Sequence, residues 1–219
     1  MKNLTKLIGL VLLLIIIAIP QSVFSGGHSL KILGWGAKSG PLKSFGVNSE
    51  AALRSAVAEI NAAGGVRMGD GSMAPMEVIG YEDSACKKDE AIAILRKTAS
   101  TTDAIVGMGT TCSGVCQAMF GVLQKKRGDT SDSGVQMPIL ADTCIRPGLA
   151  KISDWSFRNV PNEITMYDEM FKWIRSAYPN VKTFTGGSET DQGHSFITYT
   201  AIIVQMAVKH GFEWVGPPV

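Results

Sequence analysis

Hydrophobic and polar positions follow two different spacings, and segments with one spacing alternate along the chain with segments that have the other. Short apolar runs predict strands, and apolar residues three or four positions apart predict helices. Seven runs predict strands or extended segments, at 30–35, 76–81, 103–108, 137–141, 155–160, 181–185 and 212–215. Five stripes between them predict helices, led by Leu53, Ala91, Val115, Tyr167 and Tyr199. Strands that alternate with helices favour an α/β fold, a doubly wound parallel sheet sandwiched by helices.

The loops that follow the predicted strands are the first place to search for a functional site. Ligands of doubly wound sheets bind beyond the carboxyl ends of the strands. These loops are rich in Gly, Ser, Thr, Cys and Asp, and span 34–41, 82–86, 107–113, 141–146 and 186–193. Small and polar residues of this kind suit the binding of a polar ligand.

The first 25 residues have the order of a secretory signal peptide. Two lysines precede an apolar run, residues 7–19, which ends at Pro20. The run is shorter than the roughly 20 residues that cross a bilayer, so cleavage after Ser25 is favoured over a membrane anchor. The first cysteine is Cys86, so no lipid attachment is expected near the cleavage site. We therefore expect a periplasmic protein that is not lipid-anchored.

Composition and charge narrow the classes of protein. Hydrophobic residues make up 45% of the chain, which supplies a core and excludes a disordered protein. The chain has 21 basic and 19 acidic residues, and the predicted signal peptide contains two of the basic ones and no acid. The remaining charges balance. No basic excess is left for nucleic-acid binding, so we expect no nucleic-acid partner.

The four cysteines favour disulfides over a metal site. An exported protein meets an oxidising compartment, and four cysteines can pair completely in three ways. Structural zinc is the alternative, but Cys112 and Cys116 are four positions apart and the histidines are remote in sequence. The cysteines are Cys86, Cys112, Cys116 and Cys144, and the histidines are His28, His194 and His210. We expect no metal and no other cofactor.

Known catalytic motifs do not match the sequence when they are compared residue by residue. The glycines of residues 34–40 are one position out of register with a dinucleotide fingerprint, and no phosphate-binding P-loop is present. Ser113 lacks the flanking glycines of a hydrolase elbow. His194 is the one histidine in a strand-end loop, where a solvated residue at a helix start is the simpler interpretation than a general base. We expect that the protein is not an enzyme.

The start of the helix after residue 112 is the best candidate for binding. Residues 110–114 read Thr-Thr-Cys-Ser-Gly, and exposed N–H groups at a helix start bind anions. The Ser113 hydroxyl could add a hydrogen bond to a ligand carboxylate. The alternative is that Ser113 only caps its own helix, which spacing alone favours.

Four stretches give the chain a family resemblance. They are Gly36–Pro41 with Phe45–Gly46, Ala58–Val66, Tyr81–Cys86 and Gly107–Ser113. In order and spacing they resemble the periplasmic branched-chain amino-acid (Leu/Ile/Val) binding proteins of ABC transporters, which have a type I periplasmic binding fold. The resemblance covers essentially all of the chain after the signal peptide, and it is loose after Gly128.

The resemblance implies two lobes that clamp a ligand. Residues 1–25 would be the signal peptide, 26–159 the first α/β lobe, and 160–219 the beginning of a second, incomplete lobe. We would then expect the chain to be a piece of a longer protein and to bind weakly by itself. Its partners would be a small polar solute (an amino acid, an amide or a related compound) and the membrane permease of an ABC transporter. A ligand-sensing domain of a receptor with the same fold is the alternative.

The same resemblance implies roles for single residues. It implies a disulfide between Cys86 and Cys112, and leaves a Cys116–Cys144 bridge as a hypothesis. It places a set of residues around the ligand: Phe45, Cys112, Ser113, Gly114, Asp142, Thr143, Cys144 and Gln192. Ser113 would hold a carboxylate, and the Thr143 hydroxyl would hold the solute with its loop. The family has small apolar residues where this chain has Asp142 and Arg146, so we expect a solute other than a purely aliphatic amino acid.

Overall fold

The computed structural model describes residues 29–187 and 196–216. The described residues fall into two compact units. Of the described residues, the smaller unit contains Ser29 and Leu30 together with Ser55–Glu77, and the larger contains Lys31–Arg54 and the described residues from Val78 onward. The predicted signal peptide, His28, Gln192 and His194 lie outside the described residues. The predicted division at residue 160 stays a prediction.

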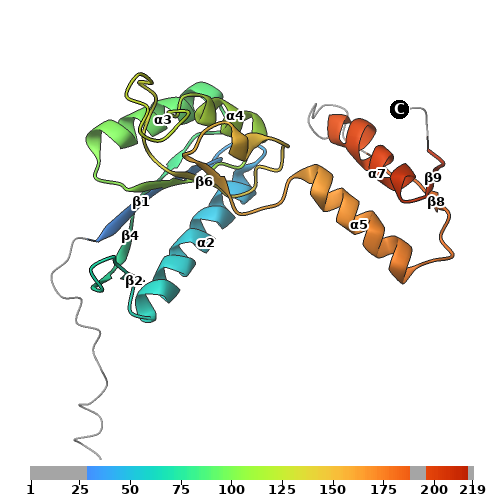
Figure 1. Cartoon of the computed structure of the whole chain (residues 1–219), viewed down its shortest axis with the longest axis horizontal. Helices are drawn as coiled ribbons and strands as arrows, with labels where there is room; N and C mark the ends of the chain where they lie inside the picture. Colours follow the sequence, from blue (N-terminus) through green and yellow to red (C-terminus); the bar gives the residue numbers. More distant parts are fainter. Residues whose placement is uncertain (1–28, 188–195, 217–219) are drawn as a thin grey trace, which may run out of the picture. The chain divides into compact units, whose positions relative to one another are not determined.

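A five-stranded sheet is the centre of the larger unit (Figure 1). Its strands lie in the order β4, β1, β5, β6, β7, and the pairs β1–β5, β5–β6 and β6–β7 are parallel. The strands are β1 (Leu30–Gly36), β4 (Met76–Asp83), β5 (Val106–Met108), β6 (Ile139–Ala141) and β7 (Ser156–Arg158). The strand order changes direction at β1, as in a doubly wound sheet. The predicted α/β fold class is confirmed.

Three helices belong to the connections of this sheet: α2 (Lys43–Ala62), α3 (Lys88–Thr101) and α4 (Ser113–Gly121). α3 and α4 lie together on one face, and the first half of α2 lies on the other (Figure 1). The core between the sheet, α3 and α4 contains fully buried Trp35, Phe120 and Leu95. Trp35 Nε1 donates to the sulfur of Met119 on α4 over 3.2 Å, so even the indole N–H is satisfied inside this core.

The smaller unit contains a hairpin that the sequence pattern did not predict. Strands β2 (Val66–Arg67) and β3 (Met73–Ala74) pair antiparallel. The side chain of Asn61 on α2 both donates to the Met76 carbonyl and accepts from its N–H, each over 2.8 Å. This pair of bonds fixes the start of β4 against the end of α2.

The residues after β7 have a small apolar cluster of their own. Helix α5 (Glu163–Ala177) begins where the Asn162 side chain accepts from the N–H of Thr165, a normal N-cap. Strands β8 (Thr183–Phe184) and β9 (Glu213–Trp214) pair parallel in a separate sheet. Phe171, Ala207 and Phe212 form the buried cluster. The helix predicted from the Tyr199 stripe contains a π-helical turn (η2, Thr198–Ile203) before α7 (Val204–Lys209).

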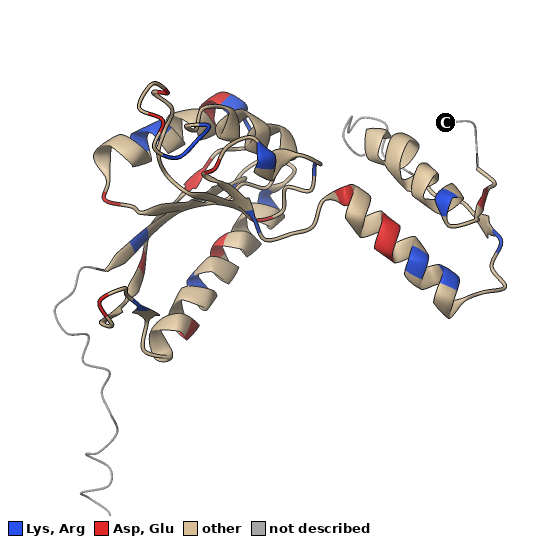
Figure 2. Cartoon of the chain, in the orientation of Figure 1, with Lys and Arg blue, Asp and Glu red and all other residues tan. Residues whose placement is uncertain are grey.

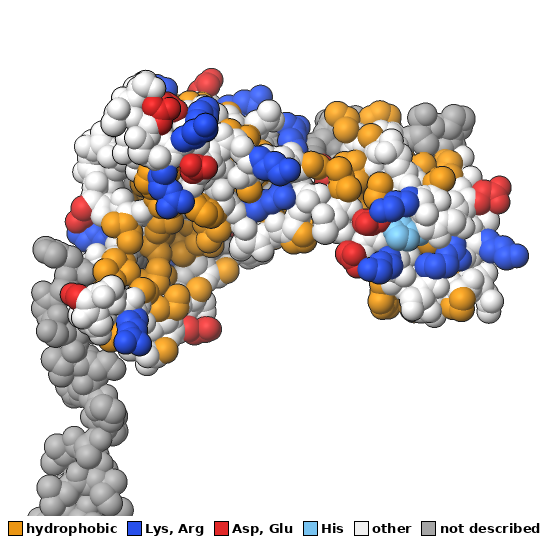
Figure 3. Space-filling view, viewed as in Figure 1, with side chains coloured by type: hydrophobic (Ala, Val, Ile, Leu, Met, Phe, Trp, Pro, Cys, Tyr) orange, Lys and Arg blue, Asp and Glu red, His pale blue; other side chains and the backbone are white. Residues whose placement is uncertain are grey.

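The surface has no face of a single charge among the described residues in view. Acidic and basic residues alternate along α2, whereas on α5 the acidic residues precede the basic ones (Figure 2). Hydrophobic side chains gather near β1 and β4 in the space-filling view (Figure 3). No helix in the described part of the chain is long and apolar enough to span a membrane.

Candidate functional site

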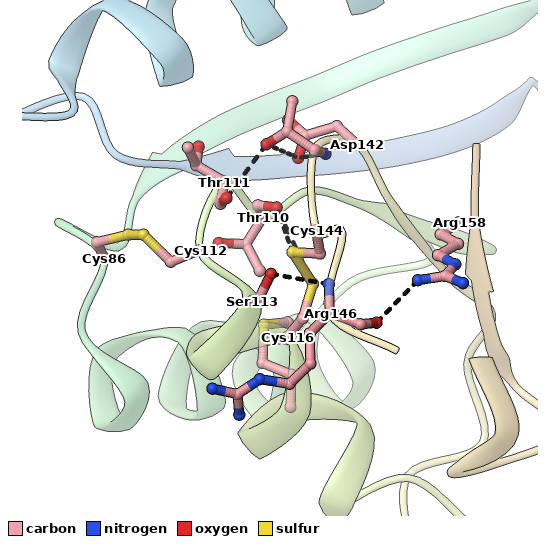
Figure 4. Close-up of a disulfide and its surroundings, with 12 residues drawn as sticks. Cys86, Thr110, Thr111, Cys112, Ser113, Cys116, Asp142, Cys144, Arg146 and Arg158 are labelled. Atoms are coloured by element: carbon pink, nitrogen blue, oxygen red, sulfur yellow. Dashed lines mark hydrogen bonds between the residues drawn. A yellow bond between two sulfur atoms is a disulfide. The ribbon is translucent and has the colours of Figure 1, made fainter. Parts of the chain in front are cut away.

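The change of strand order at β1 separates the loops that follow β1 and β5. The loop after β1 leads to α2 on one face, and the loop after β5 leads to α4 on the other. A crevice between such loops is the usual ligand site of a doubly wound sheet. The loop after β6, residues 142–146, lies beside the start of α4 (Figure 4). The chain thus brings two of its predicted ligand-binding segments together.

The start of α4 presents unsatisfied backbone donors. Cys112 precedes the helix in an extended conformation and gives no side-chain cap. The N–H groups of Ser113 and Gly114 make no hydrogen bond to any described residue. Such donors, at the positive end of a nine-residue helix, suit a carboxylate or another anion.

Ser113 does not cap its helix. It is the first helical residue, and its Oγ accepts the N–H of Arg146 over 3.3 Å. The capping interpretation that spacing favoured is therefore wrong. Because a hydroxyl both donates and accepts, the bond from Arg146 leaves the Ser113 O–H free to donate to a ligand.

Thr143 ties the 142–146 loop to the segment before α4. Its Oγ1 lies 3.2 Å from the carbonyl oxygen of Thr111 and 3.2 Å from Asp142 Oδ1. Its N–H also donates to Asp142 Oδ1, over 2.6 Å. These bonds hold the two segments in register (Figure 4). Thr143 is partly exposed, which leaves it accessible to a solute.

Asp142 carries a buried oxygen with no partner. The residue is 7% exposed, and its Oδ2 makes no hydrogen bond. The hydroxyls of Thr110 and Thr111 are also buried and unbonded. Buried polar atoms are nearly always hydrogen-bonded in folded proteins, so three such atoms in adjoining loops point to a ligand or water. Sequence reasoning missed both threonine hydroxyls, since nothing in a Thr-Thr pair indicates their burial.

Tyr81 is a further residue near Asp142, and no sequence motif assigned it to the site. Its ring packs over Gly34 and Gly36 of β1, where any side chain would collide with it. Burial, and then the negative charge of Asp142, raise the pKa of its hydroxyl well above the usual value. The Tyr81 hydroxyl is therefore neutral at physiological pH.

All four cysteines form disulfides. Cys86 is bonded to Cys112 with 5.9 Å between the Cα atoms, and Cys116 to Cys144 with 6.6 Å. Both bridges end at the first turn of α4 or directly before it (Figure 4). The sulfur of Cys144 is buried 2.9 Å from the Thr110 carbonyl oxygen. Cys144 is fully buried, whereas Cys112 is partly exposed.

Phe45 lines a hollow together with Thr143. The hollow has a volume of about 350 Å³, and the first turns of α2 supply the rest of its wall through Ser44, Asn48, Ser49 and Ala52. Phe45 itself is half exposed. The structure thus places two predicted ligand contacts, one from α2 and one from the 142–146 loop, at one opening. Gln192 falls outside the described residues.

A larger hollow of about 790 Å³ lies elsewhere, at the ends of α3 and α4 and the loop 132–136. It contains none of the predicted site residues. Nor does any group of three His, Cys, Asp or Glu side chains able to hold a metal occur in residues 29–187 or 196–216.

Solved structures share this architecture. No protein-family model and no curated protein sequence matches the chain. The isoleucine-bound branched-chain amino-acid transporter protein LivJ of Streptococcus pneumoniae superimposes with a TM-score of 0.61 at 20% identity, over 86% of this chain and 49% of its own. A putative branched-chain amino-acid ABC transporter protein of Rhodospirillum rubrum gives 0.59 at 23%, over 88% and 51%.

The chain has a type I periplasmic binding fold. A third neighbour with this fold is a solute-binding protein of an ABC transporter from R. palustris in complex with 4-hydroxybenzoate, with a TM-score of 0.63 at 14% identity, over 86% of this chain and 46% of its own. The expected resemblance to branched-chain amino-acid transporter proteins is confirmed at the level of fold. The chain spans about half the length of these solved chains. Neighbours with the type I periplasmic binding fold are solute-binding proteins, and their ligands include amino acids and aromatic acids.

Proposed function

We propose that the chain is part of an extracytoplasmic solute-binding protein that captures a small polar solute for the permease of an ABC transporter, and that it catalyses no reaction. The observation that carries this proposal is the start of α4. There, the N–H groups of Ser113 and Gly114 make no hydrogen bond to a described residue, and the Ser113 Oγ accepts the N–H of Arg146 from the 142–146 loop. The solved neighbours, which are transporter proteins with small-molecule ligands, support the same role.

The anionic end of the solute binds at α4. The N–H groups of Ser113 and Gly114 and the Ser113 O–H together offer three donors to one carboxylate. Thr143 and Phe45 line the opening beside it. Backbone donors at a helix start are fixed before the ligand arrives, so little conformational entropy is lost when they bind it.

A solute screen followed by two substitutions at one position tests this proposal. Amino acids, amides, urea and small carboxylic acids are screened at millimolar concentrations by thermal shift. The affinity of each hit is then measured by calorimetry. Ser113→Ala removes the hydroxyl alone. Ser113→Pro also removes the N–H, and proline fits the first helical position after an extended residue such as Cys112.

We expect Ser113→Ala to weaken binding about 10- to 100-fold, because a hydrogen bond to a charged group contributes roughly 1.5–3 kcal/mol. Ser113→Pro should weaken it further. The control is Ser100→Ala, at the end of α3 and in the wall of the larger hollow, which should leave the affinity unchanged. Unchanged affinity in both Ser113 variants would show that the solute does not bind at α4.

A further inference from the structure

The two disulfides differ in how easily a reductant can reach them. Cys116 and Cys144 are both fully buried, whereas Cys86 and Cys112 are both partly exposed. Thiol–disulfide exchange needs direct attack of a thiolate on one of the two sulfurs, so access decides which bridge reacts first. The Cys86–Cys112 bridge is therefore the one that a reductant opens.

The backbone beside Cys86 also favours opening of this bridge. Ala85 and Cys86 have φ angles of +46° and +58°, in the left-handed region that residues with a side chain rarely adopt. Two restraints hold this turn: Asp83 Oδ1, which accepts the N–H of Ala85 over 2.8 Å, and the bridge to Cys112. Opening the bridge removes one of them, so the two residues can relax toward ordinary backbone angles.

Cys112 occupies the N-cap position of α4. Its backbone is extended, with φ of −103° and ψ of 121°, and a side chain at such a position can accept the N–H of the second or third helical residue. The third N–H, of Val115, already donates to the Cys112 carbonyl over 2.9 Å, whereas the second, of Gly114, makes no hydrogen bond to a described residue. The bridge directs the Cys112 sulfur toward Cys86, so it caps nothing (Figure 4).

A thiolate released at Cys112 would be stabilised where it forms. The N–H groups at a helix start attract negative charge, and cysteines at such positions ionise readily. Lys88, the first residue of α3, adds a positive charge nearby, because its Cε lies 3.8 Å from the place that a Cβ on Gly114 would take. The thiolate would accept the Gly114 N–H, which is the donor that a solute carboxylate needs.

We propose that the Cys86–Cys112 bridge is a redox switch for the anion site at α4. The bridged chain leaves the Gly114 N–H open to the solute, and the reduced chain occupies it with the Cys112 thiolate. The inference rests on the proposed function, because the switch acts on the donors that hold the solute carboxylate.

The reductant is a dithiol. One of its thiolates attacks the Cys86 sulfur, and Cys112 leaves as a thiolate, because the sulfur with the more stable thiolate leaves faster. The second thiol of the reductant then attacks the mixed disulfide and releases Cys86. The dithiol ends as a disulfide, the two cysteine sulfurs gain two electrons, and water takes up the proton that Cys112 does not keep.

Three variants that lose the same bridge test the switch without a reductant. Cys86→Ala leaves the Cys112 sulfur free to cap α4, and Cys112→Ala leaves a free Cys86 but no sulfur at α4. Cys86→Ala/Cys112→Asp places a carboxylate cap there instead. Peptide mapping checks that Cys116 and Cys144 stay bonded to each other. The probes are isoleucine, leucine and 4-hydroxybenzoate, the ligands of three solved neighbours, and calorimetry at pH 8 measures their affinity.

We expect the bridged chain to bind at least one probe. Cys86→Ala and Cys86→Ala/Cys112→Asp should bind that probe about tenfold or more weakly than Cys112→Ala, the factor that one hydrogen bond to a charged group contributes. Hydrogen exchange followed by NMR gives a readout that needs no solute. The Gly114 amide should exchange more slowly in the two capped variants than in Cys112→Ala, because the cap protects it.

The outcomes separate this inference from the proposed function. Equal affinities of Cys86→Ala and Cys112→Ala would show that only loss of the bridge matters, and an equal exchange rate of Gly114 would show that no cap forms. Either result would overturn the inference, and binding by the bridged chain would leave the proposed function standing. Absence of binding of all three probes by the bridged chain would count against both. The amide NMR spectrum of each variant reports whether it is folded.

Discussion

The close approach of the β5 end to β1 depends on one residue, Gly109. Its φ is +136°, a conformation that favours glycine, and a side chain there would collide with the carbonyl of Trp35. The segment that follows Gly109 carries the buried threonines and the start of α4. The backbone at Gly109 therefore sets where the proposed anion site lies relative to the sheet.

Gly109→Ala should lower the free energy of unfolding by at least about 2 kcal/mol, because strain and a backbone collision add. Chemical denaturation measures this. The matched control is Gly121→Ala at the end of α4, where a new methyl group meets no atom within 4 Å. That variant should be neutral or stabilised by up to about 1 kcal/mol. Equal stability of the two variants would contradict the close approach.

Single residues also show which parts of the proposed site could be predicted from the sequence. Ser113 was chosen from its place at a helix start, and that place is correct, but its hydroxyl accepts from Arg146 rather than capping the helix. The family resemblance places Asp142 in the loop that holds the ligand, and its charge departs from the family pattern. The position of the Tyr81 ring depends on two glycines of another strand, Gly34 and Gly36, and no local sequence pattern reveals this contact. Contacts between segments distant in sequence were the part that could not be predicted.

At the scale of elements, α4 is held by two disulfides. One bridge ends at Cys112, directly before the helix, and the other joins Cys116 within it to Cys144 in the 142–146 loop. The second bridge links the two segments that form the proposed site. Its removal should therefore change the solute affinity as well as the free energy of unfolding.

Replacing Cys116 and Cys144 together by alanine should lower the free energy of unfolding by about 3–4 kcal/mol, the entropic estimate for closing a loop with a sequence separation of 28. Solute affinity should fall at the same time, because Thr143 is no longer held beside α4. The double variant Cys86→Ala/Cys112→Ala loses a loop of similar size and is the control. A greater loss of affinity in the control would assign the positioning role to the first bridge. Denaturation and calorimetry measure both effects.

Elements with a clear apolar period were predicted well, and those without one were missed. The stripe from Leu53 predicts the later turns of α2, but the helix begins ten residues earlier, at Lys43, where polar residues and Gly46 hide the period. The β2–β3 hairpin has only two residues in each strand, too few for a pattern. The π-helical turn at Thr198–Ile203 shifts the helical register in a way that a 3.6-residue period does not express.

At the scale of the whole molecule, strand order decides where a site can lie. The switch at β1 puts α2 and α4 on opposite faces of one sheet, and their first turns meet the 142–146 loop at its carboxyl edge. Alternation of strands and helices predicted the parallel sheet and its site-bearing edge. It did not determine the strand order itself.

Export is the whole-chain property that the N-terminal sequence predicts. We expect cleavage after Ser25, so that the protein in the periplasmic fraction begins at Gly26. Intact mass and N-terminal sequencing check this. Recovery of the chain with Met1 in the membrane pellet would contradict it, and would favour the membrane-anchor interpretation of residues 7–19.

The central claim is that the solute binds at the start of α4, and a titration followed by backbone amide NMR tests it most directly. The best solute of the screen is added to the isotopically labelled chain, and the shift of each assigned amide is followed. The account predicts the largest changes at Ser113 and Gly114, with Thr143 next. Changes confined to the larger hollow, around Ser100, Leu123 and Val135, would contradict it.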